Sequence, residues 1–179
     1  MLLAVDLVEC VPNISEGRRV EVIDACARAV RSVSGVWLLD RTSDPDHDRS
    51  VLTFAGAPER VQEAMRALAA EATARIDLRR QHGRHPRIGA LDVAPFVPIG
   101  DTTMATCVEL AEAFGGWLSD RYRLPVFLYA RAARRPDRVV LADIRRPAFE
   151  GLAAALARPG GAPELGPCLL YTSDAADEL

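Results

Sequence analysis

The residues best suited to chemistry gather in one short stretch, from Arg79 to Asp92. Two of the three histidines of the chain, His82 and His85, lie here among four arginines. A histidine can gain or lose a proton near neutral pH, and a guanidinium group can bind a carboxylate or phosphate through paired hydrogen bonds. The stretch therefore predicts acid–base chemistry on an anionic substrate. Its arginines are Arg79, Arg80, Arg84 and Arg87.

A second group of polar residues occupies the turn 43–49, which holds three aspartates and His47. Aspartate and histidine can bind a divalent metal, but their spacing here matches no established ligand pattern. An Asp-Pro-Asp sequence is typical of a solvated turn, so we expect no metal. A metal-dependent hydrolase stays open as an alternative function, one that uses Asp44, Asp46, His47 and His85.

Composition restricts the function further. The 179 residues suffice for one domain with a real core, and a net charge of −3 argues against nucleic-acid binding through bulk charge. All 22 basic residues are arginine, which excludes a lysine Schiff base or a P-loop lysine. The four cysteines form no Cys-x-x-Cys pair, and no apolar run approaches the ~20 residues of a membrane span. We therefore expect a cytoplasmic protein with reduced thiols and no membrane partner.

Hydrophobic spacing predicts the elements that position these residues. Through residue 98 their order is strand, helix, strand, strand, helix, strand, the split βαβ pattern of ferredoxin-like folds. We therefore expect an α+β fold, with a ferredoxin-like sheet, helices packed on one face, and an extra helix and strand. Pro95 and Pro98 lack an N–H and place the fourth strand at a sheet edge. Strands are expected over Val5–Pro12, 36–39, 50–54, 91–98 and 125–129. Helices are expected over about 18–33, from Pro58 to about Arg75, from Thr102 or Thr103 onward, and as short helices across 131–157 that are broken by Pro147. In the third of these helices Met104 is expected to face inward.

The turn from Asn13 to Gly17 directly precedes the first predicted helix. The N-terminus of a helix can receive an anion through its free N–H groups. The simpler interpretation is that Ser15 caps this helix with its hydroxyl. Both interpretations stay open on the sequence alone.

Three motifs together resemble one known family. Val8–Gly17, Asp48–Val51 and His85–Val93 are similar to the N-terminal subdomain of glutamate formimidoyltransferase, and the resemblance covers roughly residues 6–167. The first and third motifs are long and unusual, so they carry far more weight than a lone pair of histidines. Further matching pieces are Thr53-Phe54, the helix start Gly56–Pro58, Pro95-Phe96, Pro98, Ala113–Gly115, Pro125-Val126, Leu128-Tyr129 and Ala142–Arg145.

This resemblance implies transfer of the formimino group from N-formimino-L-glutamate to tetrahydrofolate, which serves as the co-substrate. Members of the family have two similar ferredoxin-like subdomains with folate bound in a channel between them, and some also carry a cyclodeaminase domain. We expect the intact protein to form a homo-oligomer. The family's catalytic histidine is the one in His-Pro-Arg, which here is His85, while His82 and the other arginines of the stretch are expected at the surface.

Candidate binding residues follow from the chemistry of the substrates. Arg49 and Arg87 can pair with glutamate carboxylates, and Asp92 can orient His85 or Arg87 or cap a local turn. The predicted substrate-binding residues are Asn13, Ser15, Gly17, Arg49, Arg87 and Asp92, and the predicted folate-binding residues are Gly166 and Pro167.

The sequence departs from the family in three places. Asp48 stands where the family usually has asparagine, and Arg84 where it often has an acid. After Pro167 the family continues into its C-terminal subdomain, whereas residues 168–179 resemble nothing in it. We therefore expect an N-terminal subdomain over 1–167, a non-family tail over 168–179 and a missing C-terminal subdomain. A non-catalytic folate- or glutamate-binding module is the further alternative.

Overall fold

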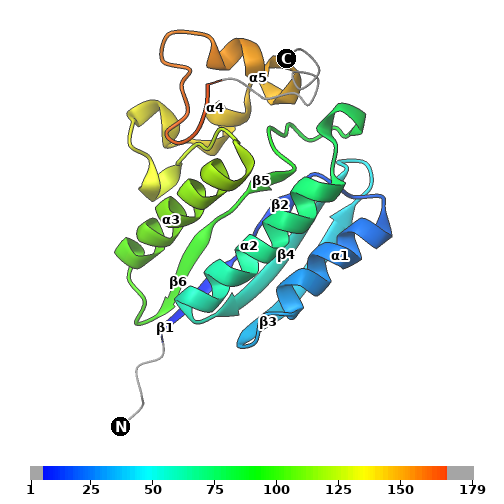
Figure 1. The fold of residues 1–179 in the computed structure, drawn as a ribbon, viewed down its shortest axis with the longest axis vertical. Coiled ribbons are helices and arrows are strands. Elements are labelled where there is room, and N and C mark those ends of the chain that lie inside the picture. Colours follow the sequence, from blue (N-terminus) through cyan, green and yellow to red (C-terminus); the bar gives the residue numbers. More distant parts are fainter. Residues whose placement is uncertain (1–5, 169–179) are drawn as a thin grey trace. The chain divides into compact units, whose positions relative to one another are not determined.

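The computed structural model of the protein describes residues 6–168. The chain divides into two compact units, one ending at Ala111 and the other beginning at Glu112. The first unit contains β1 (Asp6–Cys10), β2 (Asn13–Ile14), α1 (Val20–Arg31), β3 (Val36–Asp44), β4 (Arg49–Gly56), α2 (Pro58–Arg75), the 3-10 helix η1 (Leu78–Arg80), β5 (Leu91–Val93) and β6 (Phe96–Gly100), drawn in Figure 1.

The strands of the first unit form one sheet in which each described pair is antiparallel. β1 and β2 run one after the other along the same side of β4, and β3 pairs with the other side of β4. β6 pairs with β1, and β5 pairs with β2. The α+β class expected from the sequence is therefore confirmed.

The strand expected over 91–98 is divided in two, because Ala94 and Pro95 separate β5 from β6. Both pieces lie at the edge of the sheet, as the prolines predicted. Pro98 lies opposite Val8 of β1. A proline has no N–H to offer a second neighbouring strand, so the edge is the place in a sheet that tolerates it.

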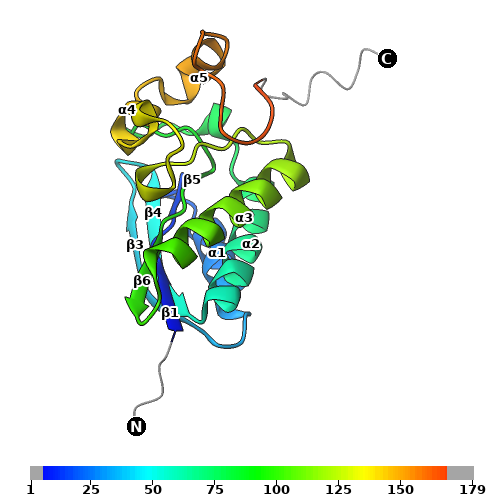
Figure 2. The same cartoon turned by 90° about the vertical axis from the view of Figure 1, so that its left-hand side faces the viewer.

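Helices α1 and α2 cover one face of this sheet (Figures 1 and 2). Their apolar residues recur every three or four positions, which makes one stripe of each helix apolar. In β4 the inward positions are every second residue, since side chains of a strand alternate between the two faces. The core between the layers includes Val8, Cys10, Val22, Ile23, Cys26, Val30, Leu52, Phe54, Val61, Met65, Leu68 and Ala72.

The second unit is mostly helical. Helix α3 (Met104–Tyr122) begins before the boundary between the units, and the remaining elements are η2 (Ala130–Ala132), η3 (Pro136–Arg138), α4 (Leu141–Arg145) and α5 (Ala148–Leu156). The short helices expected on either side of Pro147 are present. Of the expected tail over 168–179, only Cys168 lies within the described residues.

Two expectations for α3 and the residues that follow it are wrong. The apolar run Pro125–Tyr129 is not a strand. Val126 forms an isolated bridge with Leu165, and the N–H of Leu128 donates to the side chain of Glu164 in place of a neighbouring backbone. An extended apolar run becomes a strand only where a neighbouring backbone accepts its hydrogen bonds along its length. Met104, expected to face inward, is 44% exposed because it stands in the first turn of α3.

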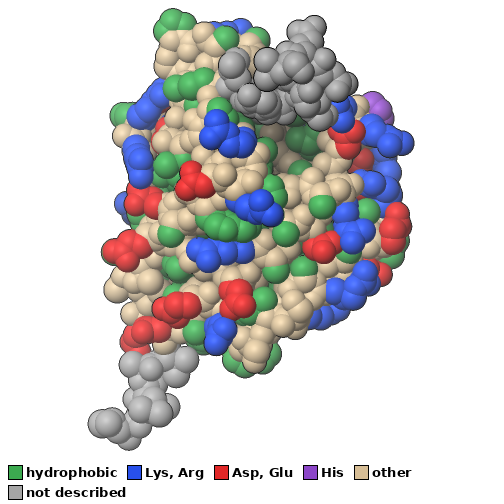
Figure 3. Space-filling view, in the orientation of Figure 1, with side chains coloured by type: hydrophobic (Ala, Val, Ile, Leu, Met, Phe, Trp, Pro, Cys, Tyr) green, Lys and Arg blue, Asp and Glu red, His purple; other side chains and the backbone are tan. Residues whose placement is uncertain are grey.

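No helix within residues 6–168 is both long and apolar enough to cross a membrane. On the face drawn in Figure 3, basic and acidic side chains are interspersed. This mixture agrees with the small net charge of the chain.

Replacing Phe54 tests the proposed core. The side chain is fully buried, so Phe54→Ala is expected to lower the free energy of unfolding by about 3–5 kcal/mol through lost contacts and a cavity. Urea unfolding of both proteins measures the difference. Thr53→Ala is the matched control, since the neighbouring side chain points to the opposite face, and it should cost far less. Equal losses for the two variants would show that the faces are assigned wrongly.

Candidate functional site

Three loops that are distant in the sequence meet at one end of the sheet: residues 15–19, the β3–β4 turn 44–49, and residues 78–90. Two glycines permit the close approach. A Cβ on Gly17 would lie 2.2 Å from the carbonyl oxygen of Asp44, and one on Gly83 would lie 2.1 Å from that of His47. Neither position can hold a larger residue without moving the backbone of the turn.

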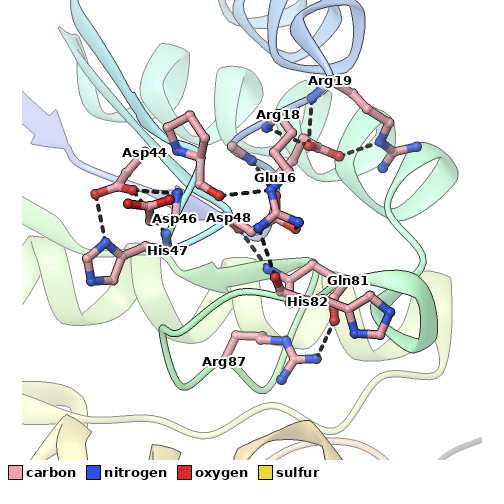
Figure 4. Close-up of polar contacts among 12 residues, drawn as sticks. Glu16, Arg18, Arg19, Asp44, Asp46, His47, Asp48, Gln81, His82 and Arg87 are labelled. Atoms are coloured by element: carbon pink, nitrogen blue, oxygen red, sulfur yellow. Dashed lines mark hydrogen bonds and ion pairs between the residues drawn. The ribbon is translucent and has the colours of Figure 1, made fainter.

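Asp48 stands at the centre of this junction (Figure 4). Its side chain is buried, and its Oδ1 accepts a hydrogen bond of 2.9 Å from the N–H of Gly17. Its main-chain carbonyl accepts one of 2.7 Å from Nε2 of Gln81. The φ angle of Asp48 is +50°, a left-handed conformation that aspartate and asparagine adopt more readily than most residues. Asp48 therefore links each of the other two loops to the turn.

Arg18 joins the same three loops from outside. Its Nε donates to the carbonyl of Pro45 at 2.8 Å, and its Nη2 donates to the carbonyl of His82 at 3.0 Å. Its Nη1 lies 3.6 Å from Oδ2 of Asp48. Half of this side chain is exposed, so the ion pair itself contributes little to stability, whereas the two carbonyl contacts fix where the loops lie.

The junction brings Arg49, the first residue of β4, to the loop that carries His85. Nη1 of Arg49 lies 3.2 Å from Nε2 of His85, and both side chains are half-buried. A guanidinium group can only donate hydrogen bonds, so Nε2 accepts in this contact and a neutral ring carries its proton on Nδ1. The pair therefore offers a proton-accepting nitrogen beside a cation that can bind an anion.

A buried carboxylate binds the backbone just before α1. Oε1 of Glu16 accepts the N–H groups of Arg18 and Arg19, at 2.9 and 2.8 Å. Both residues precede Val20, the first residue of α1, so anion binding by the N–H groups of the helix itself stays a prediction. The helix cap expected from Ser15 is wrong, because its hydroxyl donates to the carbonyl of Gly89 at 2.8 Å.

The other predicted binding residues of the first unit lie around the junction. Asn13 is in β2, opposite Val51 and next to β5. Arg87 is only 6% exposed and donates to the carbonyl of Gln81 at 3.0 Å. Asp92 accepts the N–H of Ile88 at 2.7 Å, which is the local turn contact. Substrate contacts by Asn13, Arg87 and Asp92 stay predictions.

Gly166 and Pro167 belong to the second unit. Gly166 has a φ angle of +89°, and a Cβ there would lie 2.2 Å from the carbonyl oxygen of Leu124. The glycine is therefore required by the local backbone of its own unit. Folate binding by these two residues stays a prediction.

The surface positions in the 79–92 stretch agree with expectation, since His82, Arg79, Arg80 and Arg84 are exposed. In the sequence Asp48 stands out only as a departure from a family pattern, and no pattern there indicates the roles of Arg18, Gln81 or Glu16. The glycines at 17 and 83 were the available signal, because each stands where another segment touches the backbone.

Two buried cysteines are not suited to act as nucleophiles. Burial raises the pKa of the Cys26 thiol to about 11 and that of Cys10 well above its usual range, so these cysteines are not poised as thiolates. Among residues 6–168 no three histidine, cysteine or acidic side chains are grouped to hold a metal. His47 instead pairs with Asp44, with Nδ1 and Oδ2 separated by 2.7 Å.

Similarity to known proteins extends over nearly the whole chain. The sequence model of one protein family, described as the formiminotransferase domain, N-terminal subdomain, matches residues 7–174. The formimidoyltransferase-cyclodeaminase of Sus scrofa is 48% identical over 93% of this chain and 31% of its own length. The glutamate formimidoyltransferases of Streptococcus pyogenes serotype M1 and Thermoplasma acidophilum are each 43% identical, over 89% and 95% of this chain and 54% and 57% of their own lengths. The chain thus spans from about a third to somewhat over half of these relatives.

A series at position 48 tests the junction. Asp48→Asn keeps an acceptor for the Gly17 N–H and should stay within about 1 kcal/mol of the original stability. Asp48→Gly is expected to lose about 1–3 kcal/mol, because this buried N–H loses its partner. Asp48→Ala should lose about 1–2 kcal/mol more, since alanine is strained in the left-handed region.

Urea unfolding of the original protein and its Asn, Gly and Ala variants at position 48 measures their free energies of unfolding and so gives this order of stability. Asp46→Asn is the control, because Asp46 is an exposed aspartate on the same turn. A glycine variant as stable as the asparagine variant would show that the side chain of Asp48 does not hold the loops.

Proposed function

The chain belongs to the formiminotransferase family, whose N-terminal subdomain it matches, and we propose that it supplies the catalytic histidine of an enzyme that transfers the formimino group from N-formimino-L-glutamate to tetrahydrofolate. The observation that carries this proposal is the pair formed by Arg49 and His85. It lies in a region that is 43–48% identical to the formimidoyltransferases described above.

Formimino transfer requires two proton movements. A nitrogen of tetrahydrofolate attacks the formimino carbon and loses a proton, and the departing nitrogen of glutamate gains one. A positioned histidine that performs such transfers accelerates a reaction roughly 10²–10⁴-fold. We assign this work to His85, while the surrounding loops hold its backbone.

Arg49 is the first candidate for a glutamate carboxylate. Its guanidinium group contacts Nε2 of His85 in the structure without substrate. A carboxylate forms stronger, charge-assisted hydrogen bonds with guanidinium than a neutral imidazole does. Substrate binding would therefore draw Arg49 toward the carboxylate and leave Nε2 of His85 available to take a proton. Arg87 is the second candidate, since its guanidinium group belongs to the same loop as His85.

The complete enzyme is proposed to contain a second subdomain that closes the folate channel. The length of the relatives beyond the matched part supports this. The sheet order β3, β4, β1, β6 supports the finer description of the first unit as a ferredoxin-like fold. Folate contacts by Gly166 and Pro167, a homo-oligomer and a cytoplasmic location belong to the same proposal, the last supported by the four free cysteines.

An activity assay on two forms of the protein tests the function. One form is the 179-residue chain, and the other is residues 1–167 joined to the C-terminal part of the Streptococcus pyogenes relative. The joined protein is expected to transfer the formimino group to tetrahydrofolate, and His85→Gln should slow it about 10²–10⁴-fold. His82→Gln, an exposed histidine on the same loop, should leave the rate unchanged.

The outcomes separate the competing functions. Tight binding of folate or formiminoglutamate without turnover by the joined protein would favour a binding module. Activity that requires an added divalent metal, with a metal bound by elemental analysis, would favour the hydrolase alternative. A joined protein in which His85→Gln is as fast as the original would disprove the role of His85.

Arg49 is tested by its effect on substrate affinity. Arg49→Lys keeps the charge but loses the fork that pairs with a carboxylate. It is expected to raise the KM for N-formimino-L-glutamate about tenfold, as loss of one strong hydrogen bond predicts, with a smaller effect on the KM for tetrahydrofolate. Steady-state kinetics of the joined protein give both values. An unchanged KM for the glutamate substrate would place its carboxylates elsewhere.

A further inference from the structure

One group of polar residues near the site has no part in the proposed function: the pair formed by Asp44 and His47. Oδ1 of Asp44 accepts the main-chain N–H groups of Asp46 and His47, both at 2.9 Å, and Oδ2 contacts Nδ1 of His47 at 2.7 Å. These contacts hold the pKa of Asp44 below its usual value, with the hydrogen bonds from His47 as the main cause. The carboxylate therefore occupies Nδ1 of His47 and not Nε2, and about half of each side chain is exposed.

The ring of His47 lies beside that of His85. Their centroids are 6.3 Å apart and the rings meet edge to face. The backbones of the two loops are locked to each other, because Arg84 donates its N–H to the carbonyl of Asp46 at 3.2 Å and Gly83 lies directly against the carbonyl of His47. The distance between the two rings is therefore set by the loop junction.

The two rings have partners of opposite charge. His47 contacts a carboxylate through Nδ1, whereas His85 contacts a guanidinium group through Nε2. Two titratable groups whose surroundings differ in this way are suited to opposite roles in proton transfer. A carboxylate at Nδ1 also stabilises the charged ring of a histidine that carries a second proton.

We propose that His47 is a second proton-transferring residue, positioned by Asp44, and that it takes over one of the two proton movements assigned above to His85. It protonates the leaving glutamate nitrogen, while His85 takes the proton of the attacking folate nitrogen. This inference rests on the proposed function. The two nitrogens are bound to the same carbon in the intermediate, so both can be within hydrogen-bond reach of rings separated by this distance.

The proton and electron balance is complete. The folate nitrogen uses its lone pair to form a bond to the formimino carbon, the π pair of the C=N bond moves onto the imino nitrogen, and the folate nitrogen gives a proton to Nε2 of His85. The C=N bond then re-forms as the bond between that carbon and the glutamate nitrogen breaks, and the departing nitrogen keeps this electron pair and takes a proton from Nε2 of His47. Both rings return to their initial states by exchanging one proton each with solvent.

Two titratable groups lie against the ring of His47. These are the carboxylate of Asp44, on its own turn, and the imidazole of His85, on the facing loop. The guanidinium group of Arg49 is the next charge, since it contacts the ring of His85.

Kinetics of the joined protein test the proposal. His47→Gln cannot transfer a proton, so kcat should fall about 10²-fold while KM changes little. The pH profile should also lose its alkaline limb, because that limb reports the group that must be protonated. Asp44→Asn should lower kcat by a smaller factor. It should add nothing to His47→Gln in the double variant, because Asp44 acts through His47.

His82→Gln is the control for removing a histidine from this region, and His85→Gln is assayed in parallel. If His85→Gln is inactive while His47→Gln keeps its rate and both limbs, the inference is wrong and the proposed function stands. If the joined protein transfers no formimino group, or if its His85→Gln variant transfers the group as fast as the original, the proposed function and this inference both fail.

A second measurement uses the 179-residue chain and needs no activity. At alkaline pH, where the rings are neutral, the ring nitrogen signals in 15N NMR should show one dominant tautomer for His47, with the proton on Nδ1. Asp44→Asn should remove this preference, and exposed His82 should show a mixture. A mixture for His47 in the original chain would mean that Asp44 does not hold it, which overturns the inference.

Discussion

Two hydrogen bonds at Asp48 join three loops that are distant in the chain. One comes from the N–H of Gly17, 31 residues before Asp48, and the other from the side chain of Gln81, 33 residues after it. Both bonds are buried, so leaving either donor without its acceptor costs far more than an exposed bond would. The hydrogen bond between the hydroxyl of Ser50 and the carbonyl of Glu16, two residues further along β4, extends the same contact. The relative positions of all proposed reactive groups follow from this junction.

Most of the support and the chemistry fall to different side chains. Three of the groups that hold the loops, Asp48, Gln81 and Glu16, are buried. The groups proposed to react, including His85, keep part of their surface open to solvent. Buried hydrogen bonds determine orientation because water cannot compete for them, whereas a reacting ring must still meet its substrate. This division explains why a rigid junction can surround a site that remains accessible.

The sheet serves the site through its irregularities. β1 and β2 follow the same side of β4 across the break at Pro12, whose carbonyl still accepts the N–H of Leu52. A matching break at Pro95 separates β6 from β5. Beyond these breaks the chain is free to turn, and the N–H of Ser15 and its hydroxyl bind the loop before β5. The regular part of the sheet is therefore a platform, and the site forms where its pairing becomes irregular.

The sequence by itself determined the local features. Hydrophobic period predicted α1, α2 and most of the strands, because it depends on neighbouring residues alone, and the His-Pro-Arg motif identified His85 before any geometry. The sequence did not predict that Glu16 accepts the two N–H groups just before α1, nor that the run 125–129 forms a single bridge in place of a strand. Only the tertiary structure decided these outcomes and the pairing of Arg49 with His85. The physical reason is that a polar group is satisfied by whichever partner lies near in space, and the sequence does not show which segments folding brings together.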